Sequence, residues 1–414
     1  MSQKILCPYC FTSFKNTDAL CQCTNNEVNS ATGEPYCPKE PDKALSDYRR
    51  EGGLVSKHLY KARVPLFSGI PAPTKCDRCG AVSSRFVCPH CHNALPQEMI
   101  EEGAEIISII GAPSSGKTVY FVALINALES CGFRLGLSVR PKDEVPGGMS
   151  MPGGGETTAK IYGRLKDDLF GEGYLPNQTA RSERSLPLIF RLTSSVEAFK
   201  YNKNDKSIYL VFYDTAGESF TDPESIANNV KYLKESSGII LLLDPFSVPE
   251  LRKMLEKAGI QMEENRGDVR EVLTQLLGIA DNKVNLRKKP IAVTFSKIDS
   301  VVNGLEQAGE DRIQGIDLRM DSSFLRSGVF SPMEVQQNSD ALFTYCVDKW
   351  RLGQVLQDVG ASFANYKLFG VSSLGGSPDE DNPNHITDIK PYRVLDPLVW
   401  ILTQMNGFHI PVEK

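Results

Sequence analysis

The sequence predicts an α/β protein: a mostly parallel sheet with helices on both faces, preceded by two small zinc-ribbon modules. Two observations support this prediction. From residue 104 onward, short apolar runs alternate with stretches of helical apolar spacing, which is the pattern of a parallel sheet with crossover helices. Before residue 95, nine of the eleven cysteines stand in pairs and near-pairs, a spacing typical of metal ligation.

Six apolar runs are the expected strands. Each is apolar along its length and not in alternation, as strands buried on both faces are. They lie within residues 105–110, 186–192, 208–214, 238–244, 290–299 and 366–373. Helical apolar spacing is found over residues 119–128, 248–259, 267–280, about 333–363 and 394–405.

Composition divides the chain into four parts. We expect an irregular zinc-binding module over 1–40, a charged, proline-bearing linker over 41–73, a zinc ribbon over 74–95 and the α/β domain over 104–410. The net charge of −5 gives no overall electrostatic footprint for nucleic acid or a membrane surface, although it is compatible with a local basic patch. No secretory signal opens the chain and no apolar stretch approaches the roughly 20 residues of a membrane span, so we expect a cytoplasmic location.

Residues 111–118, GAPSSGKT, follow the first expected strand and precede a helix. In such a turn, glycines let backbone N–H groups point at phosphate oxygens, Lys117 reaches the outer phosphates and the Thr118 hydroxyl ligates Mg²⁺. The pattern predicts a nucleoside-triphosphate site with contacts at Gly111, Ser114, Ser115, Gly116, Lys117, Thr118 and Val119. Residues 141–158 hold five glycines and three prolines, and we expect a mobile loop there, beside the phosphate site.

The metal needs a second acidic element, and the expected strand at 208–214 supplies it by ending in Asp214. Asp214 is placed to bind Mg²⁺ directly or through water, and the Gly217 N–H to meet a γ-phosphate. The alternative is an ordinary strand-ending turn, in which Asp and Gly are common.

The segment TFSKIDS follows another expected strand and is the candidate for reading the base. The Asp299 carboxylate can accept hydrogen bonds from N1 and N2 of guanine, donors that adenine does not present, while the Lys297 stem packs on the ring. The last strand ends in Ser372 and Ser373, where backbone N–H groups are placed to meet the guanine O6. An isolated Lys–Asp pair is by default a solvated one.

These motifs resemble a known family. GAPSSGKT, DTAGE, SKID and SSLG are similar to the ordered motifs of P-loop GTPases of the Ras-like translation-factor class. With the cysteine-rich front and the closing RVLDPLVWIL, the chain most resembles the bacterial double-GTPase domains. The resemblance covers residues 104–410 and implies the GTPase fold, binding of GTP and GDP with Mg²⁺, and slow hydrolysis.

Three departures from that family pattern bear on activity. Ser296 stands where these GTPases usually have Asn or Thr, which weakens the expected brace between base loop and phosphate loop. Glu218 stands where many have a water-orienting glutamine, and its charge near the γ-phosphate opposes binding even as it can accept a water proton.

The third departure is the long interval before Asp214, which leaves the switch threonine ambiguous. Thr179 is favoured because it precedes the second strand, with Thr157 and Thr158 as alternatives. Arg181 and Arg184 are candidates for a stabilising arginine, or are solvated charges. The expected catalytic residues are Lys117, Glu218 and Thr179.

Two CxxC knuckles place four thiolates for a closed tetrahedral zinc site: Cys76, Cys79, Cys88 and Cys91. The first module offers five cysteines for four positions, and of the closely spaced Cys21 and Cys23 we favour the second. Its expected ligands are therefore Cys7, Cys10, Cys23 and Cys37. We expect two structural zinc ions, with His90 and His92 as bystanders and with Cys131 and Cys346 in the core.

The leading interpretation is a GTP-binding switch that hydrolyses GTP slowly and docks other proteins through its zinc ribbons. One alternative is a nucleotide-stabilised adaptor, for which Glu218 and Ser296 would mark lost catalysis. Another is a nucleic-acid-associated ATPase, although the net charge gives no indication of a nucleic-acid partner.

Overall fold

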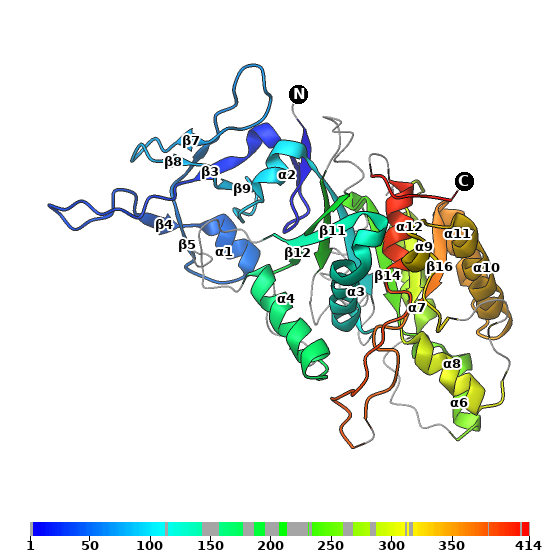
Figure 1. The fold of residues 1–414 in the computed structure, drawn as a ribbon. Coiled ribbons are helices and arrows are strands. Elements are labelled where there is room, and N and C mark those ends of the chain that lie inside the picture. Colours follow the sequence, from blue (N-terminus) through cyan, green and yellow to red (C-terminus); the bar gives the residue numbers. More distant parts are fainter. Residues whose placement is uncertain are drawn as a thin grey trace.

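The computed structural model gives the fold shown in Figure 1. It describes residues 3–111, 115–142, 157–176, 186–194, 207–212, 231, 234–259, 268–281, 287–310, 313, 318–379, 381–405 and 408–413.

The centre of the molecule is a sheet of seven strands, counted over the described residues, in the order β11-β12-β13-β10-β14-β15-β16. Strands β13, β10, β14, β15 and β16 are parallel, whereas β12 is antiparallel to both of its neighbours. The predicted mostly parallel sheet is confirmed, and each of the six apolar runs overlaps one strand. The strands are β10 (Ala104–Gly111), β11 (Leu137–Pro141), β12 (Leu188–Ser194), β13 (Ser207–Phe212), β14 (Gly238–Leu243), β15 (Ile291–Phe295) and β16 (Tyr366–Gly370).

Side chains of the sheet alternate between two apolar faces, as the pleat of a strand requires. In β10, Ile107 and Ile109 lie in one buried cluster and Ile106 and Ile110 in the other. The first face is covered by α3 (Lys117–Cys131), α4 (Thr158–Lys166), α9 (Phe324–Ser327) and α12 (Asp396–Gln404). The second is covered by α6 (Pro249–Lys257), α7 (Val269–Asp281), α8 (Ile298–Gln307) and α11 (Gly353–Ser362). Helices on both faces are thus also confirmed.

The helical spacing over residues 333–363 corresponds to two helices, α10 (Pro332–Asp348) and α11. Between them Arg351 has a φ of 55°, a left-handed conformation that a continuous helix does not accommodate. Trp350 is fully buried at this corner. No helix in the described part of the chain has the length and apolar character that a membrane crossing requires.

The N-terminal unit, residues 3–95, is built from segments far apart in sequence. Strand β3 (Leu20–Gln22) pairs with both β6 (Leu59–Lys61) and β9 (Phe86–Val87). Residues 41–73, expected to be a linker, instead contribute α1 (Lys43–Arg49), β5 (Val55–Lys57) and β6. The physical reason is that the short first segment cannot bury its apolar side chains alone, so Tyr60 and Phe86 complete one core with Ile5 and Phe14.

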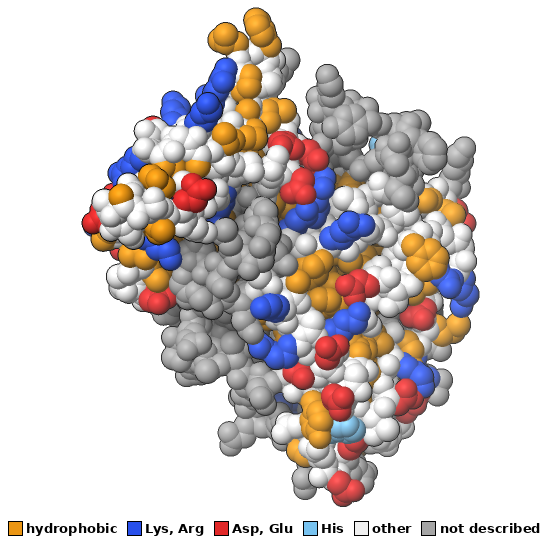
Figure 2. Space-filling model, turned by 60° about the vertical axis from the view of Figure 1, so that its left-hand side comes forward, with side chains coloured by type: hydrophobic (Ala, Val, Ile, Leu, Met, Phe, Trp, Pro, Cys, Tyr) orange, Lys and Arg blue, Asp and Glu red, His pale blue; other side chains and the backbone are white. Residues whose placement is uncertain are grey.

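The N-terminal unit contacts the sheet at the amino-terminal ends of the parallel strands. Strand β10 ends in Gly111 at the opposite side of the sheet. At the amino-terminal ends, the hairpin of β1 (Lys4–Leu6) and β2 (Ser13–Lys15) approaches Glu235, just before β14, with Ser13 Oγ donating to Glu235 Oε2 at 3.0 Å. Helix α2 (Gln97–Glu102) follows the unit, and its Glu102 forms an ion pair with Arg191 of β12. Figures 1 and 2 show the unit as a lobe that projects from the sheet domain.

Candidate functional site

The predicted nucleotide-binding motifs lie at one edge of the sheet, where the parallel strands end. Strand register places Gly111 opposite Leu242, Leu242 opposite Thr294, and Thr294 opposite Phe369. The loops that follow β10, β14, β15 and β16 therefore leave the sheet at one level. The phosphate turn follows β10 and the base-reading segment follows β15, with only β14 between them, so they are two strand spacings apart, roughly 10 Å. This edge is where open α/β sheets bind ligands.

The phosphate turn has the backbone conformation that its glycines allow. A Cβ on Gly111 would lie 2.6 Å from the carbonyl oxygen of Leu242, so no larger residue fits there. Gly116 has a φ of 74° and directly precedes α3, whose first residue is Lys117. Lys117 Nζ donates to the Gly111 carbonyl at 3.0 Å, which holds the ammonium group over the turn. The positive end of the α3 dipole adds to this charge, so the turn favours an anion.

Three further predicted contacts of the turn lie around the start of α3. Ser115 is fully buried, and Thr118 and Val119 are partly exposed in the first helical turn. Ser114 lies outside the described residues. The next residue, Tyr120, is fully buried and donates its hydroxyl to the Val394 carbonyl at 3.1 Å. The phosphate turn is thereby fixed to the loop before α12.

The segment predicted to read the base is held by contacts to β14 and to the residue that follows it. Ser296 Oγ donates to the Leu243 carbonyl at 3.1 Å, so it links β15 to the neighbouring strand. Lys297 has a φ of 53°, and its Nζ lies 2.7 Å from Asp244 Oδ2. Asp244 was not among the predicted site residues. Its position immediately after an apolar strand, like that of Asp214, was the signal for it.

Asp299 is a buried carboxyl group, with 4% of its surface exposed, in the first turn of α8. Burial raises the pKa of Asp299, and hydrogen bonds from Ser372 and from Ser300 act in the opposite direction. Ser372 is fully buried, and its backbone N–H donates to the Tyr392 carbonyl at 3.0 Å. That N–H is therefore not directed at a base, and the contact of the neighbouring Ser373 N–H with guanine stays a prediction.

Several predicted site residues lie outside the described residues: Ser114, Thr179, Arg181, Arg184, Asp214, Gly217, Glu218 and most of the 141–158 loop. The alternative switch threonines are described. Thr157 Oγ1 accepts the Lys160 N–H at 3.3 Å as the N-cap of α4, and Thr158 Oγ1 accepts the Ile189 N–H at 3.3 Å. Both hydroxyls thus have structural partners in the fold.

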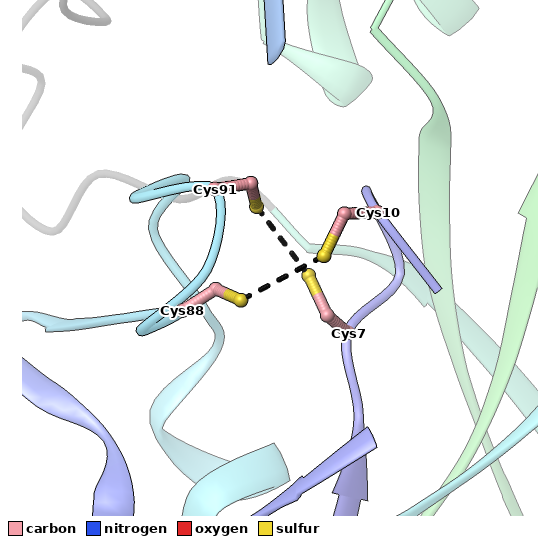
Figure 3. Close-up of side chains that lie close together, drawn as sticks. All are labelled: Cys7, Cys10, Cys88 and Cys91. Carbon is pink, nitrogen blue, oxygen red and sulfur yellow. Dashed lines mark hydrogen bonds between the residues drawn. The ribbon is translucent and has the colours of Figure 1, made fainter. Parts of the chain in front are cut away.

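The eight predicted zinc ligands form two groups of four, but the grouping by sequence segment was wrong. One group is Cys7, Cys10, Cys88 and Cys91, drawn in Figure 3, and the other is Cys23, Cys37, Cys76 and Cys79. Each site takes two cysteines from the first segment and two from the second. The pairing of β3 with β9 brings the two segments together, and this long-range contact is invisible in cysteine spacing. Cys21 is in neither group and contacts the Ser83 carbonyl.

The sulfur positions fit tetrahedral zinc. Sγ–Sγ distances are 3.7 Å for Cys7–Cys91, 3.8 Å for Cys10–Cys88, 3.5 Å for Cys23–Cys79 and 4.0 Å for Cys37–Cys76. Zn–S bonds of about 2.3 Å predict edges of about 3.8 Å in a tetrahedron. Burial raises the pKa of Cys7 well above its usual range, so a cation is needed for four thiolates to share this site.

The three CxxC turns share one backbone shape. The residue after the second cysteine is left-handed in each: Phe11 with φ 50°, Gly80 with φ 75° and His92 with φ 54°. The N–H two residues after the first cysteine points at its sulfur in two of them, Tyr9 to Cys7 and His90 to Cys88, both at 3.4 Å. Such N–H groups stabilise a thiolate. The predicted bystander His92 instead contacts Asp42 Oδ1 at 2.7 Å.

The sheet, the glycine-bracketed turn before α3 and the motifs at the same edge are the features of a P-loop α/β domain, and a cysteine-rich unit lies in front of it. Residues 175–343 match the family described as Double-GTPase 2. The matched stretch begins before β12 and ends in α10.

Other comparisons cover more of the chain. A Mycolicibacterium smegmatis protein, SaeC, named as a candidate ESX-1 scaffolding and assembly protein, is 25% identical over an alignment of 421 positions that covers 98% of this chain and 99% of that protein. The Trypanosoma brucei Arl6 BBS3 small GTPase with a bound nucleotide analogue is 10% identical, over 74% of this chain and 99% of its own, with a TM-score of 0.30. The S. cerevisiae Ski7 GTPase-like domain bound to GTP is 11% identical, over 74% of this chain and 51% of its own, with a TM-score of 0.31.

Proposed function

We propose that this protein is a GTP-binding molecular switch that hydrolyses GTP slowly and docks partners through its zinc-bearing N-terminal unit. One observation carries the proposal: the phosphate turn that starts at Gly111 and the buried carboxyl group of Asp299 lie at one edge of the sheet, two strands apart. A nucleotide lying along this edge has its phosphates at α3 and its base at α8.

Asp299 supports guanine as the base. A buried carboxylate is costly unless it accepts hydrogen bonds, and guanine offers two adjacent donors, N1–H and N2–H. Adenine offers no such pair. The Lys297 side chain, held by Asp244, lies at the same loop with its stem available to cover the base.

Lys117 and the α3 N-terminus would bind the phosphates, and Thr118 and Asp214 would hold Mg²⁺. Hydroxyl and carboxylate oxygens are the ligands that Mg²⁺ prefers. The ion would neutralise charge on the β- and γ-phosphates. Gly217 would meet the γ-phosphate, and Thr179 is the proposed switch threonine because Thr157 and Thr158 already have structural partners.

Hydrolysis is proposed to be slow. Glu218 would orient and deprotonate the attacking water, but its own charge disfavours the nearby γ-phosphate. Arg181 or Arg184 would counter that charge in cis. A partner that supplies a positive charge would accelerate the step.

Two zinc ions are proposed to hold the N-terminal unit together. Four cysteines fill each coordination sphere, so the ions have no open position for catalysis. The unit is therefore a folded platform for partners, joined to the switch domain through α2 and the β1–β2 hairpin.

The base assignment is tested by replacing Asp299 with Asn. The Asn amide has one acceptor, which can bind N1–H, and one donor group, which cannot accept from the guanine N2–H but can donate to the O2 of xanthine. Asp299→Asn should therefore lower GTP affinity at least about tenfold and raise XTP affinity. Competition titrations with GTP, ATP and XTP in Mg²⁺ measure this. Asp348→Asn, an exposed change of the same kind on α10, is the control. Equal GTP and ATP affinities in the unaltered protein would overturn the assignment.

A nucleotide-stabilised scaffold is the second candidate. It is favoured by the relative named for scaffolding and assembly, which is similar over 98% of this chain, and by Glu218 in the position of the water-orienting residue. In that case GTP binding persists without turnover.

A further inference from the structure

A loop of the N-terminal unit exposes two large apolar side chains. Between β6 and β7 (Thr74–Lys75) the chain leaves the body and returns through a bridge between Arg63 and Ala72. At its tip Leu66 is 95% exposed and Phe67 is 101% exposed. Figure 2 shows hydrophobic side chains at the upper end of the lobe, the extremity to which this loop runs in Figure 1. We refer to residues 63–72 as the apolar loop.

The apolar loop is braced rather than loosely attached. The Ser68 N–H donates to the Pro65 carbonyl at 3.2 Å, and Ser68 Oγ accepts the Ile70 N–H at 3.1 Å. The fully buried Asn16 donates its side-chain amide to the Gly69 carbonyl at 3.2 Å, which ties the returning limb to the body. The fold thus holds Leu66 and Phe67 outward at the cost of leaving both in water. A braced, fully exposed apolar pair marks an interaction site.

The charge around the apolar loop has the opposite sign to that of the whole chain. Among the Lys, Arg, Asp and Glu side chains of residues 54–88, six are basic and one, Asp77, is acidic. Asp77 is paired with His58 at 2.6 Å. The exposed side chains of Lys61, Arg63 and Lys75, at the base of the loop, form no ion pair with the described residues. In Figure 2, Lys and Arg side chains gather directly beside the apolar tip.

We propose that the apolar loop docks the protein on an anionic lipid surface, with Leu66 and Phe67 inserted among the acyl chains and Lys61, Arg63 and Lys75 at the headgroups. An apolar tip with a basic collar is the combination that binds such a surface, since burial of apolar area and attraction to anionic lipids add. The whole chain has a net charge of −5, so an anionic surface repels the molecule as a whole but attracts its basic lobe. This difference orients the lobe toward the surface.

Nucleic acid is the less suitable polyanion. Its binding to exposed aromatic side chains relies on base stacking, in which Phe67 can take part but the adjacent, equally exposed Leu66 cannot. Among acyl chains, both side chains contribute in proportion to their apolar area.

Co-sedimentation of the full-length protein with vesicles tests the proposal. Without nucleotide, the protein should bind vesicles of phosphatidylcholine mixed with phosphatidylglycerol and bind pure phosphatidylcholine weakly. The double variant Leu66→Ser/Phe67→Ser and the triple variant Lys61→Gln/Arg63→Gln/Lys75→Gln should each weaken binding at least about tenfold. The matched control is Phe133→Ser/Met333→Ser, which removes two exposed apolar side chains from the sheet domain and should bind like the unaltered protein.

Unchanged zinc content and far-UV circular dichroism in the variants exclude misfolding as the cause of lost binding. The proposal is overturned if the unaltered protein does not bind anionic vesicles, or if binding does not depend on Leu66 and Phe67. Tighter binding to single-stranded nucleic acid than to vesicles at the same salt would overturn it too, as would a protein partner that requires the loop while vesicle binding does not. Because the assay contains no nucleotide, any such result leaves the GTP proposal untouched.

Discussion

Single side chains at the carboxyl end of the sheet show how motif chemistry depends on its surroundings. Lys297 belongs to a predicted base-reading motif, yet its described partner is Asp244, on the loop after the neighbouring strand. With 41% of the Lys297 side chain and 10% of the Asp244 side chain exposed, this pair orients the loop more than it stabilises the fold. Asp299 differs because it is buried, and a buried carboxyl group requires specific donors.

Asp396 is a second buried carboxyl group, and it makes stability depend on pH. It lies at the start of α12, where its Oδ2 accepts from Arg393 at 3.1 Å. Burial raises the pKa of Asp396 to about 6, while the charge of Arg393 and a hydrogen bond from Ser322 act against this shift. An unfolded chain has an Asp pKa of about 3.9.

The folded state therefore binds the proton more tightly than the unfolded state does. The contribution of Asp396 to the free energy of unfolding should be largest below about pH 4, should fall as pH rises from about 4 to 6, and should stay constant above that, a change of at most about 3 kcal/mol. Denaturant unfolding of the unaltered protein and of Asp396→Asn across this range isolates the effect. A stability difference between the two that does not vary with pH would contradict the assignment.

At the scale of elements, the N-terminal unit is one fold made of two interleaved halves. Each predicted zinc site combines cysteines from both halves of the unit, and the β3–β9 pairing makes the same long-range connection in the backbone. A metal ion that closes such a long loop removes more conformational freedom from the unfolded chain than one that closes a single knuckle.

Zinc content should respond to this interleaving. The unaltered protein should hold two zinc ions per chain, and Cys88→Ser should reduce this to one and lower the free energy of unfolding by roughly 3 kcal/mol or more. Limited proteolysis of Cys88→Ser should open the chain near Cys7 and Cys10, far away in sequence, because they are its co-ligands. Cys21→Ser is the matched control and should keep both ions. Cleavage confined to the vicinity of residue 88 would favour two independent modules.

For the whole molecule, the two proposed activities lie at opposite ends of the sheet. The nucleotide edge is formed by the ends of β10, β15 and β16, whereas the N-terminal unit contacts the starts of the strands through Glu235. The ion pairs of Glu98 with Lys142 and of Glu102 with Arg191 join α2 to the ends of the segment that contains Thr157, Thr158 and Thr179. Helix α2, which directly follows the N-terminal unit, is thereby linked to both flanks of that segment.

Single-turnover GTP hydrolysis decides between a switch and a scaffold. Lys117→Ala should weaken triphosphate binding at least about 100-fold, because it removes the charge that compensates the phosphates. Glu218→Ala should keep GTP affinity within about threefold and slow hydrolysis roughly 10- to 100-fold, because Glu218 is proposed to act on the attacking water. If GTP is hydrolysed no faster than in buffer by the unaltered protein and by Glu218→Ala, with and without vesicles, the protein is a nucleotide-stabilised scaffold and not a switch.

The sequence by itself determined the features that depend on neighbouring residues. A strand buried on both faces must be apolar throughout, and a phosphate turn needs glycine at Gly111 and Gly116, so both can be recognised locally. The order of the motifs and the strands preceding them also placed the phosphate turn and the base-reading segment at one edge, because parallel strands end together.

Only the tertiary structure decided which distant segments meet. Cysteine spacing could not show that Cys88 joins Cys7 rather than Cys76, because that choice is made by the pairing of β3 with β9, which lie more than sixty residues apart in the sequence. The tertiary structure likewise decided three other features. Lys297 is paired with Asp244, the Ser372 N–H donates to the Tyr392 carbonyl, and Leu66 and Phe67 are exposed. Local residue chemistry sets what a side chain can do, whereas the path of the chain and its packing set which group it meets and whether it faces water.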